Sequence, residues 1–122
     1  MTPWRIGNLV WAVLLVTGAS VQLNDPDPAL WVGAYTLSAV LSIAAATERL
    51  PWVAPAIWAG VTLTWALVIA ASGVDESNPM RGPGGLLESG LFAEEIVRES
   101  MGLTLMAIGA MLQAAVLRRR AA

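Results

Sequence analysis

The chain contains no cysteine, no histidine and no lysine, so all seven of its basic residues are arginine. Without cysteine or histidine, the chain itself offers no disulfide, no thiolate or imidazole metal ligand, no cysteine nucleophile and no imidazole base. Schiff-base chemistry needs a lysine amine and is excluded as well. We therefore expect a protein that is not an enzyme, and we assign no catalytic residue, cofactor or metal ligand.

Charge is also scarce. Only 13% of the 122 residues are charged and 57% are hydrophobic, with a mean hydropathy of +0.65. Soluble domains carry about a quarter charged residues, so this balance indicates a chain that is solvated by lipid. The net charge of −2 and the pI near 4.9 argue against nucleic acid as a partner.

Four apolar runs are long enough to cross a bilayer, which takes about 20 helical residues. We predict an all-α fold, with residues 1–122 forming one transmembrane domain and the two short connections forcing antiparallel neighbours in an up-down-up-down four-helix bundle. The predicted spans cover residues 4–23, 28–47, 51–72 and 100–117, with an outer loop and interfacial helical stretch over 73–99. This stretch either lies on the outer surface or leads straight into the fourth span.

Arginine placement predicts the orientation, because cytoplasmic ends of spans are enriched in basic residues. Five arginines fall on the side of the two termini, whereas Arg81 and Arg98 fall on the other. Both termini are therefore expected in the cytoplasm, with the protein in a bacterial inner membrane. Trp4 and Trp52 would anchor the inner interface and Trp31 the outer one. The arginines expected to contact anionic lipid headgroups are Arg118, Arg119 and Arg120.

Small residues recur at helix-packing spacing in three of the spans. Such stripes let helix backbones approach closely in lipid, where the hydrophobic effect does not drive association. Packing within the bundle is the first interpretation, and contact with another subunit is the second. The predicted packing residues are Ala34, Ser38, Ser42, Ala46, Ala56, Gly60, Thr64, Gly102 and Gly109.

Several polar residues are expected on the outer side of the membrane. Capping and turn formation explain many of them; a polar cluster that locks the loop, or a site for a hard cation such as Ca²⁺, are the alternatives. This candidate outer cluster comprises Gln22, Asn24, Asp25, Asp27, Glu94, Glu95, Arg98 and Glu99.

The middle of every span is uncharged, which argues against an ion channel or pump. Polar side chains within the spans, such as Asn8 and Gln113, lie near the ends. Trp11, Trp58 and Trp65 are deeper than interfacial anchors, and we interpret them as packing or lipid-facing residues rather than as part of a pigment or quinone pocket.

The run Gln22-Leu23-Asn24-Asp25-Pro26-Asp27-Pro28, followed by Trp31 and Tyr35, resembles the signature of the transmembrane protein 220 family. The acidic stretch 94–99 and Gly102 are similar to the segment that leads into that family's last span. The resemblance implies a small protein of four spans. It implies no biochemical activity.

The first functional hypothesis is an accessory or stabilising subunit of a larger membrane complex, with a respiratory or photosynthetic assembly as a natural host. Its partners would be membrane lipids and other membrane subunits. The alternative is a stand-alone membrane protein that binds a cation or small ligand at its acidic outer face.

Overall fold

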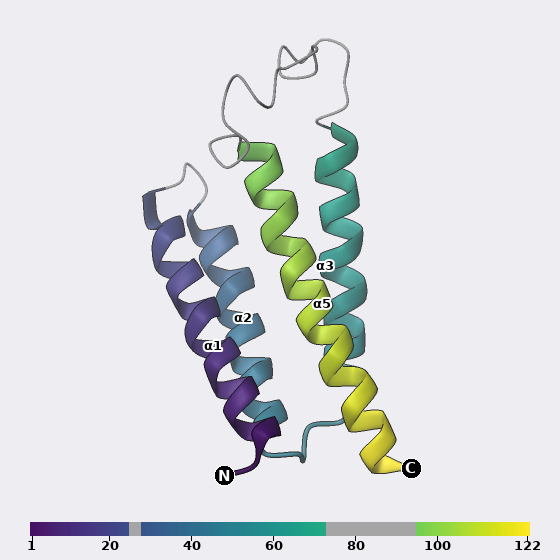
Figure 1. Ribbon diagram of the computed structural model, residues 1–122. Helices are drawn as coiled ribbons and strands as arrows, with labels where there is room; N and C mark the ends of the chain where they lie inside the picture. Colours follow the sequence, from purple (N-terminus) through teal and green to yellow (C-terminus); the bar gives the residue numbers. More distant parts are fainter. Residues whose placement is uncertain (25–27, 73–94) are drawn as a thin grey trace.

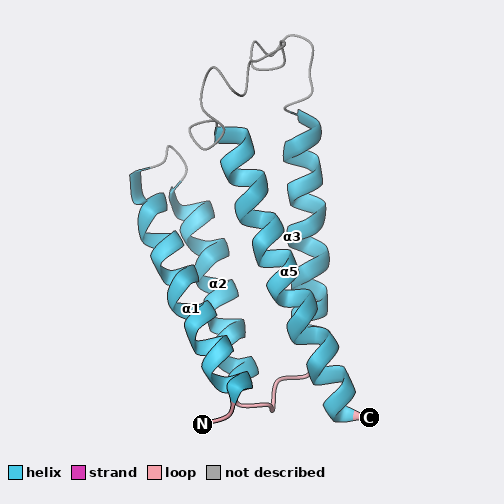
Figure 2. Ribbon diagram, viewed as in Figure 1, coloured by secondary structure: helices cyan, strands magenta, loops and turns pink. Residues whose placement is uncertain are grey.

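The computed structural model describes residues 1–24, 28–72 and 95–122, which contain helices and no strand. The elements are α1 (Pro3–Val21), the short 3-10 helix η1 (Gln22–Asn24), α2 (Pro28–Ala46), α3 (Val53–Ser72) and α5 (Glu95–Ala121) (Figures 1 and 2). The four α-helices are each long and apolar enough to cross a membrane. The predicted all-α fold with four spans is confirmed.

Local chemistry sets the helix boundaries. The hydroxyl of Thr2 accepts a hydrogen bond from the backbone N–H of Arg5 at 3.2 Å, and Pro3 occupies the first turn, so α1 begins there. α3 begins at Val53, two residues later than predicted. The last helix is longer than predicted, because α5 runs without a break from Glu95 through the predicted span. The stretch before this span therefore leads straight into it from Glu95 onward.

The helices pack mainly as two pairs, α1 with α2 and α3 with α5. Contacts place the start of α1, the ends of α2 and α5 and the start of α3 at one end of the bundle, which we call the terminal end (Figure 1). α2 lies against α5 and α3, whereas no Cα atom of α1 comes within 8 Å of one in α5. The two pairs are thus joined chiefly through α2.

The interior of the bundle is built from small residues. The stripe Ala34, Ser38, Ser42 and Ala46 on α2 is buried along its whole length. The two serine hydroxyls donate to backbone carbonyls one turn earlier, Ser38 to Ala34 and Ser42 to Ser38, each at 3.0 Å. Burial of these hydroxyls therefore leaves no unpaired donor.

Aromatic side chains fill the remaining gaps. Trp31 is only 5% exposed and stacks on Trp65 of α3, with ring centroids 5.0 Å apart and an interplanar angle of 20°. The expectation that Trp31 anchors the outer interface is therefore wrong, because the stack holds the indole inside the bundle.

Tyr35 of α2 fits into gaps left by two glycines. A Cβ added to Gly18 of α1 would lie 2.7 Å from the Tyr35 ring, and one added to Gly102 of α5 would collide with the Tyr35 hydroxyl. Gly102 therefore lets a side chain of the first helix pair reach the second, which agrees with its predicted packing role.

Replacing Gly102 with alanine is expected to lower the free energy of unfolding by about 1–3 kcal/mol, the usual cost of overpacking. The matched control is Gly33→Ala on α2, where an added Cβ meets nothing within 4 Å. Both changes gain similar helix propensity, so their difference isolates the collision with Tyr35. Unfolding in mixed micelles measures both variants, and equal stability would contradict this packing.

Candidate functional site

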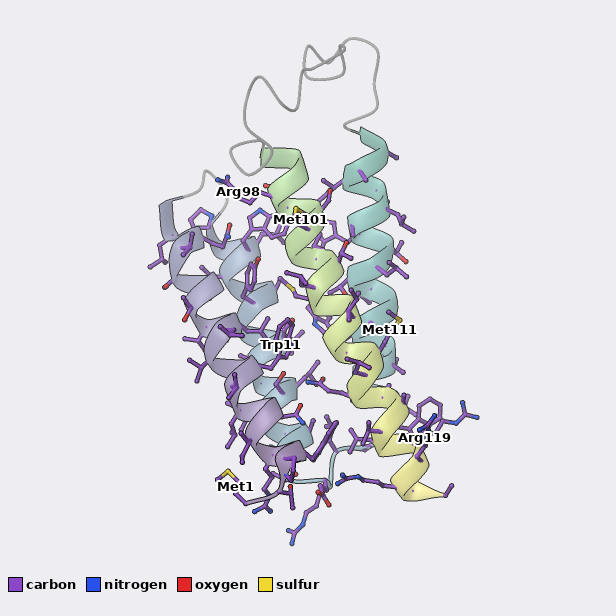
Figure 3. All side chains as sticks on the ribbon, viewed as in Figure 1. Met1, Trp11, Arg98, Met101, Met111 and Arg119 are labelled. Atoms are coloured by element: carbon purple, nitrogen blue, oxygen red, sulfur yellow. The ribbon has the colours of Figure 1, made fainter. Side chains whose placement is uncertain are left out.

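The candidate outer cluster lies mostly outside the described residues. This holds for Asp25, Asp27 and Glu94, and nothing is described of the Asn24 and Glu95 side chains. Gln22 is buried in η1. Arg98 and Glu99 lie in the first turns of α5 and each has an interaction partner; Figure 3 places Arg98 at the same end of the bundle as η1. Within the described ranges, no group of three acidic side chains is placed to hold a metal ion. The cation hypothesis gains no support from the part of the chain that is described.

At the terminal end, side chains at the start of α1 form hydrogen bonds to the backbone at the end of α2. The Arg5 Nε donates to the carbonyl of Ala46 at 3.1 Å, and the Trp4 Nε1 donates to that of Ala45 at 2.9 Å. The Ala45 carbonyl also accepts from the backbone N–H of Glu48, so Trp4 adds a second donor there, whereas Arg5 pairs the Ala46 carbonyl. The Arg5 bond places a positive charge at the negative pole of α2.

The three predicted headgroup arginines are exposed at the end of α5. Arg120 forms an ion pair with Glu48 and lies over the Trp4 ring at 5.2 Å, while Arg118 lies over Trp52 at 5.1 Å. Glu48 is a non-glycine residue with a φ of 63°, a conformation that turns the chain after α2. Arg118 and Arg120 therefore have contacts within the chain. All three side chains are exposed, so all three can still contact lipid headgroups.

The predicted packing stripes divide into two groups. The α2 stripe and Gly102 are buried, and Gly109 faces Trp11 of α1. By contrast, Gly60 and Thr64 of α3 are exposed and Ala56 is half-buried. α3 instead buries Pro55, Ala59, Thr62 and Ala66. The stripe Ala56, Gly60 and Thr64, which we call the outward α3 face, is thus left largely uncovered by the residues that the structure describes.

A buried amide network crosses the bundle near the terminal end. The side-chain nitrogen of Gln113 on α5 donates to Asn8 Oδ1 on α1 at 3.0 Å and to Ser42 Oγ on α2 at 2.8 Å. Gln113 and Asn8 are each 5% exposed and Ser42 is fully buried. Ser38, one turn from Ser42, accepts a 2.7 Å hydrogen bond from Trp58 Nε1 of α3. The network therefore joins all four helices.

The direction of every bond in this network is fixed by backbone carbonyls. The Asn8 side-chain nitrogen donates to the Trp4 carbonyl at 2.9 Å, so its oxygen must face Gln113. The Ser42 hydroxyl donates to the Ser38 carbonyl, so its oxygen can only accept from Gln113. Both N–H groups of the Gln113 side chain are therefore used as donors. Its amide oxygen has no hydrogen-bond partner among the described residues.

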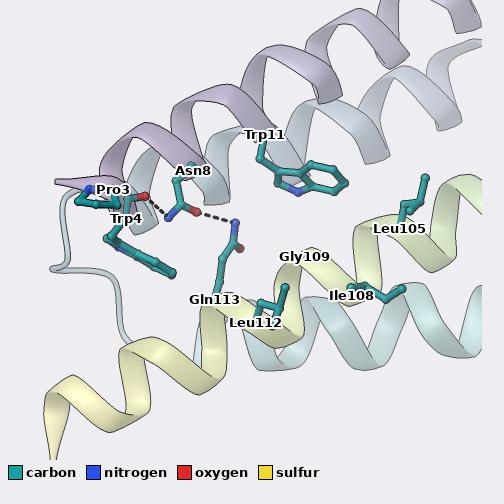
Figure 4. A pocket seen from close by; sticks show the side chains of 10 residues that line it. Pro3, Trp4, Asn8, Trp11, Leu105, Ile108, Gly109, Leu112 and Gln113 are labelled. Atoms are coloured by element: carbon teal, nitrogen blue, oxygen red, sulfur yellow. Dashed lines mark hydrogen bonds between the residues drawn. The ribbon is translucent and has the colours of Figure 1, made fainter. Parts of the chain in front are cut away.

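A pocket of about 420 Å³ opens sideways between α1 and α5, directly beside this network (Figure 4). We call it the lateral pocket. Its walls are almost entirely apolar, and none of its lining residues is charged. From α1 it is lined by Trp4, Asn8 and Trp11, and from α5 by Leu105, Gly109 and Gln113, among others. The pocket exists because α1 and α5 stay apart and are bridged only by side chains.

The sequence indicated the polar residues of this site but not their role. Asn8 and Gln113 were recognised as polar side chains near span ends, without a partner assigned to either. The sequence did contain a signal that the two could pair. Asn8 lies about one turn inside the first span and Gln113 about one turn inside the last, both at the end where the chain termini lie, and lone amides in lipid tend to bond across helices. Which helices are adjacent decides whether they meet, and the sequence alone did not give that. Trp58 and Trp65 do pack in the bundle, as expected.

Comparison with known proteins agrees with this membrane architecture. No solved structure matches the chain. A family model described as "Transmembrane family 220, helix" matches residues 14–115, which is well over half of the chain and includes part of α1, all of α2 and α3 and most of α5. The protein is thus a small multi-pass integral membrane protein, and it belongs to transmembrane family 220.

Proposed function

We propose that the protein is a non-enzymatic accessory or stabilising subunit that packs its α3 helix against a transmembrane helix of a larger membrane assembly. The observation that carries this proposal is the outward α3 face. Its three small residues repeat every four positions on a helix surface that the described residues leave largely uncovered.

The outward α3 face is shaped for close approach of another helix. A Cβ added to Gly60 would meet nothing within 4 Å, and the Thr64 hydroxyl has no hydrogen-bond partner among the described residues. A shallow groove runs along this face between bulkier side chains such as Ile57 and Val68. Small-residue grooves of this kind let helix backbones touch, and a threonine hydroxyl adds an interhelical hydrogen bond.

Other lipid-facing surfaces of the chain have a different character. On α1, Val13 and Leu14 are 66% and 57% exposed and present branched aliphatic side chains. Such side chains suit contact with acyl chains, whereas glycine and threonine on an outward face offer lipid little to pack against. This contrast supports a protein partner for α3 and lipid for α1.

Missing reactive side chains support a non-enzymatic role, since the chain has no cysteine, histidine or lysine. A respiratory or photosynthetic complex in a bacterial cytoplasmic membrane is the kind of host that we propose.

Site-specific photo-cross-linking in native membranes tests the partner. With a photoreactive residue at Thr64, we expect one discrete cross-linked membrane protein, and none with the same residue at Leu14. Gly60→Leu should fill the groove and reduce the Thr64 product at least tenfold, whereas the matched control Gly33→Leu, on an open face of α2, should not. Equal products from both faces, a product that contains only this chain, or recovery as a lone protein in mild detergent would contradict the proposal.

We also propose that both termini face the cytoplasm, since five of seven arginines lie at the terminal side. The chain has no cysteine, so single-cysteine variants report sidedness without background. In intact cells, a membrane-impermeant maleimide should label Leu23→Cys and leave Ala122→Cys unlabelled until the membrane is broken. The reverse pattern would invert the orientation.

A further inference from the structure

The lateral pocket contains two polar atoms that have no hydrogen-bond partner among the described residues. From these we propose that the pocket binds the hydroxyl group of a neutral, single-chain amphiphile, with the apolar chain lying along the cleft between α1 and α5. This site is distinct from the outward α3 face and does not depend on the accessory role.

The first polar atom is the amide oxygen of Gln113. Figure 4 shows the Gln113 side chain rising from α5 toward Asn8, with Trp11 one turn further along α1. Gln113 is only 5% exposed, and no described residue donates a hydrogen bond to its amide oxygen. A buried amide oxygen without a donor is costly, particularly where lipid rather than water surrounds the protein. The site therefore lacks a hydrogen-bond donor.

The second polar atom is the indole nitrogen of Trp11. This N–H lies on the ring edge that faces α5, where an added Cβ on Gly109 would be 2.5 Å from the nitrogen (Figure 4). Trp11 lines the same pocket and its N–H donates to no described residue. The lateral pocket thus offers one unused donor and one unused acceptor.

A hydroxyl group is the simplest partner for that pair, because a single oxygen can donate to Gln113 and accept from Trp11. A charged headgroup is disfavoured, since none of the lining residues is charged and an unpaired ion in an apolar pocket is expensive. An ether, ester or ketone could accept from Trp11 but has nothing to donate to Gln113. The chemistry therefore selects a neutral alcohol.

The apolar walls accommodate the rest of such a molecule. Leu105, Ile108 and Leu112 line the α5 side, and Gly7 leaves room on α1. Because the pocket opens sideways between two membrane-spanning helices, an amphiphile can enter from the bilayer without crossing the aqueous phase. Gly109 has a specific part in this, since any side chain there would push the Trp11 ring from its position.

Saturable binding of tritiated hexadecanol to the protein in phosphatidylcholine nanodiscs tests the proposal, with binding to empty nanodiscs subtracted. Unlabelled hexadecanol should compete about five- to tenfold more strongly than hexadecyl methyl ether, which has lost the donating proton. Trp11→Phe should weaken binding about three- to tenfold by removing the N–H while keeping an aromatic ring. Gly109→Ala should weaken it at least tenfold by displacing that ring.

Gln113→Leu removes the acceptor but also breaks the buried network, so it is informative only if the variant remains folded. Trp11→Phe and Gly109→Ala leave that network in place and keep the test decisive. The matched controls are Gly33→Ala, in open space, and Thr104→Val, which removes an exposed hydroxyl from α5 outside the pocket. Both should bind hexadecanol like the wild type. Absence of saturation, equal competition by alcohol and ether, or unchanged affinity in Trp11→Phe would overturn the proposal.

Discussion

The side-chain amide of Gln113 is the constraint around which this small bundle is organised. Placed inside a transmembrane helix, its two N–H groups must find acceptors within the protein, because lipid acyl chains offer none. It finds them on two other helices, Asn8 of α1 and Ser42 of α2. Through Ser38 the connection continues to Trp58 of α3. One side chain of the last helix is thereby linked by hydrogen bonds to the other three helices.

This constraint also explains why the two helix pairs leave a space between them. No Cα atom of α1 lies within 8 Å of one in α5, and the Gln113 and Asn8 side chains together span that distance. Trp11 fills part of the gap by lying against Gly109, and the rest remains as the lateral pocket. Polar pairing thus sets the spacing of the helices, and the spacing creates a cavity that apolar packing alone would have closed.

Two surfaces of the protein carry the functional proposals, and they lie on different helices. The outward α3 face has small side chains, forms a shallow groove and is largely uncovered by the described residues, which suits a helix of another protein. The lateral pocket is concave and has an unused donor and acceptor, which suits a small amphiphile. A subunit that holds a lipid-like molecule on one side and docks to an assembly on the other is compatible with both, and each proposal can fail without the other.

The sequence predicted the architecture well because its signals are strong and local. Apolar length identified four spans, and their predicted ends lie within about five residues of the observed helix ends. It predicted the site poorly, since Asn8 and Gln113 are 105 residues apart and meet only through the choice of neighbouring helices. Trp31 was misplaced for the same reason, because its stack on Trp65 is a tertiary contact. Likewise, the spacing of Ala56, Gly60 and Thr64 could not tell an inward face from an outward one.

A double-mutant cycle on Asn8 and Gln113 tests the central claim most directly. The free energy of unfolding is measured in mixed micelles for the wild type, Asn8→Ala, Gln113→Ala and the double variant. The coupling free energy is then calculated from the three losses of stability. If the two amides bond across the bundle, the coupling should be about 0.6 kcal/mol, the average for interhelical hydrogen bonds in membranes, and at most about 1.7 kcal/mol. Losses that simply add, to within about 0.3 kcal/mol, would show that the two side chains do not meet and would contradict the account.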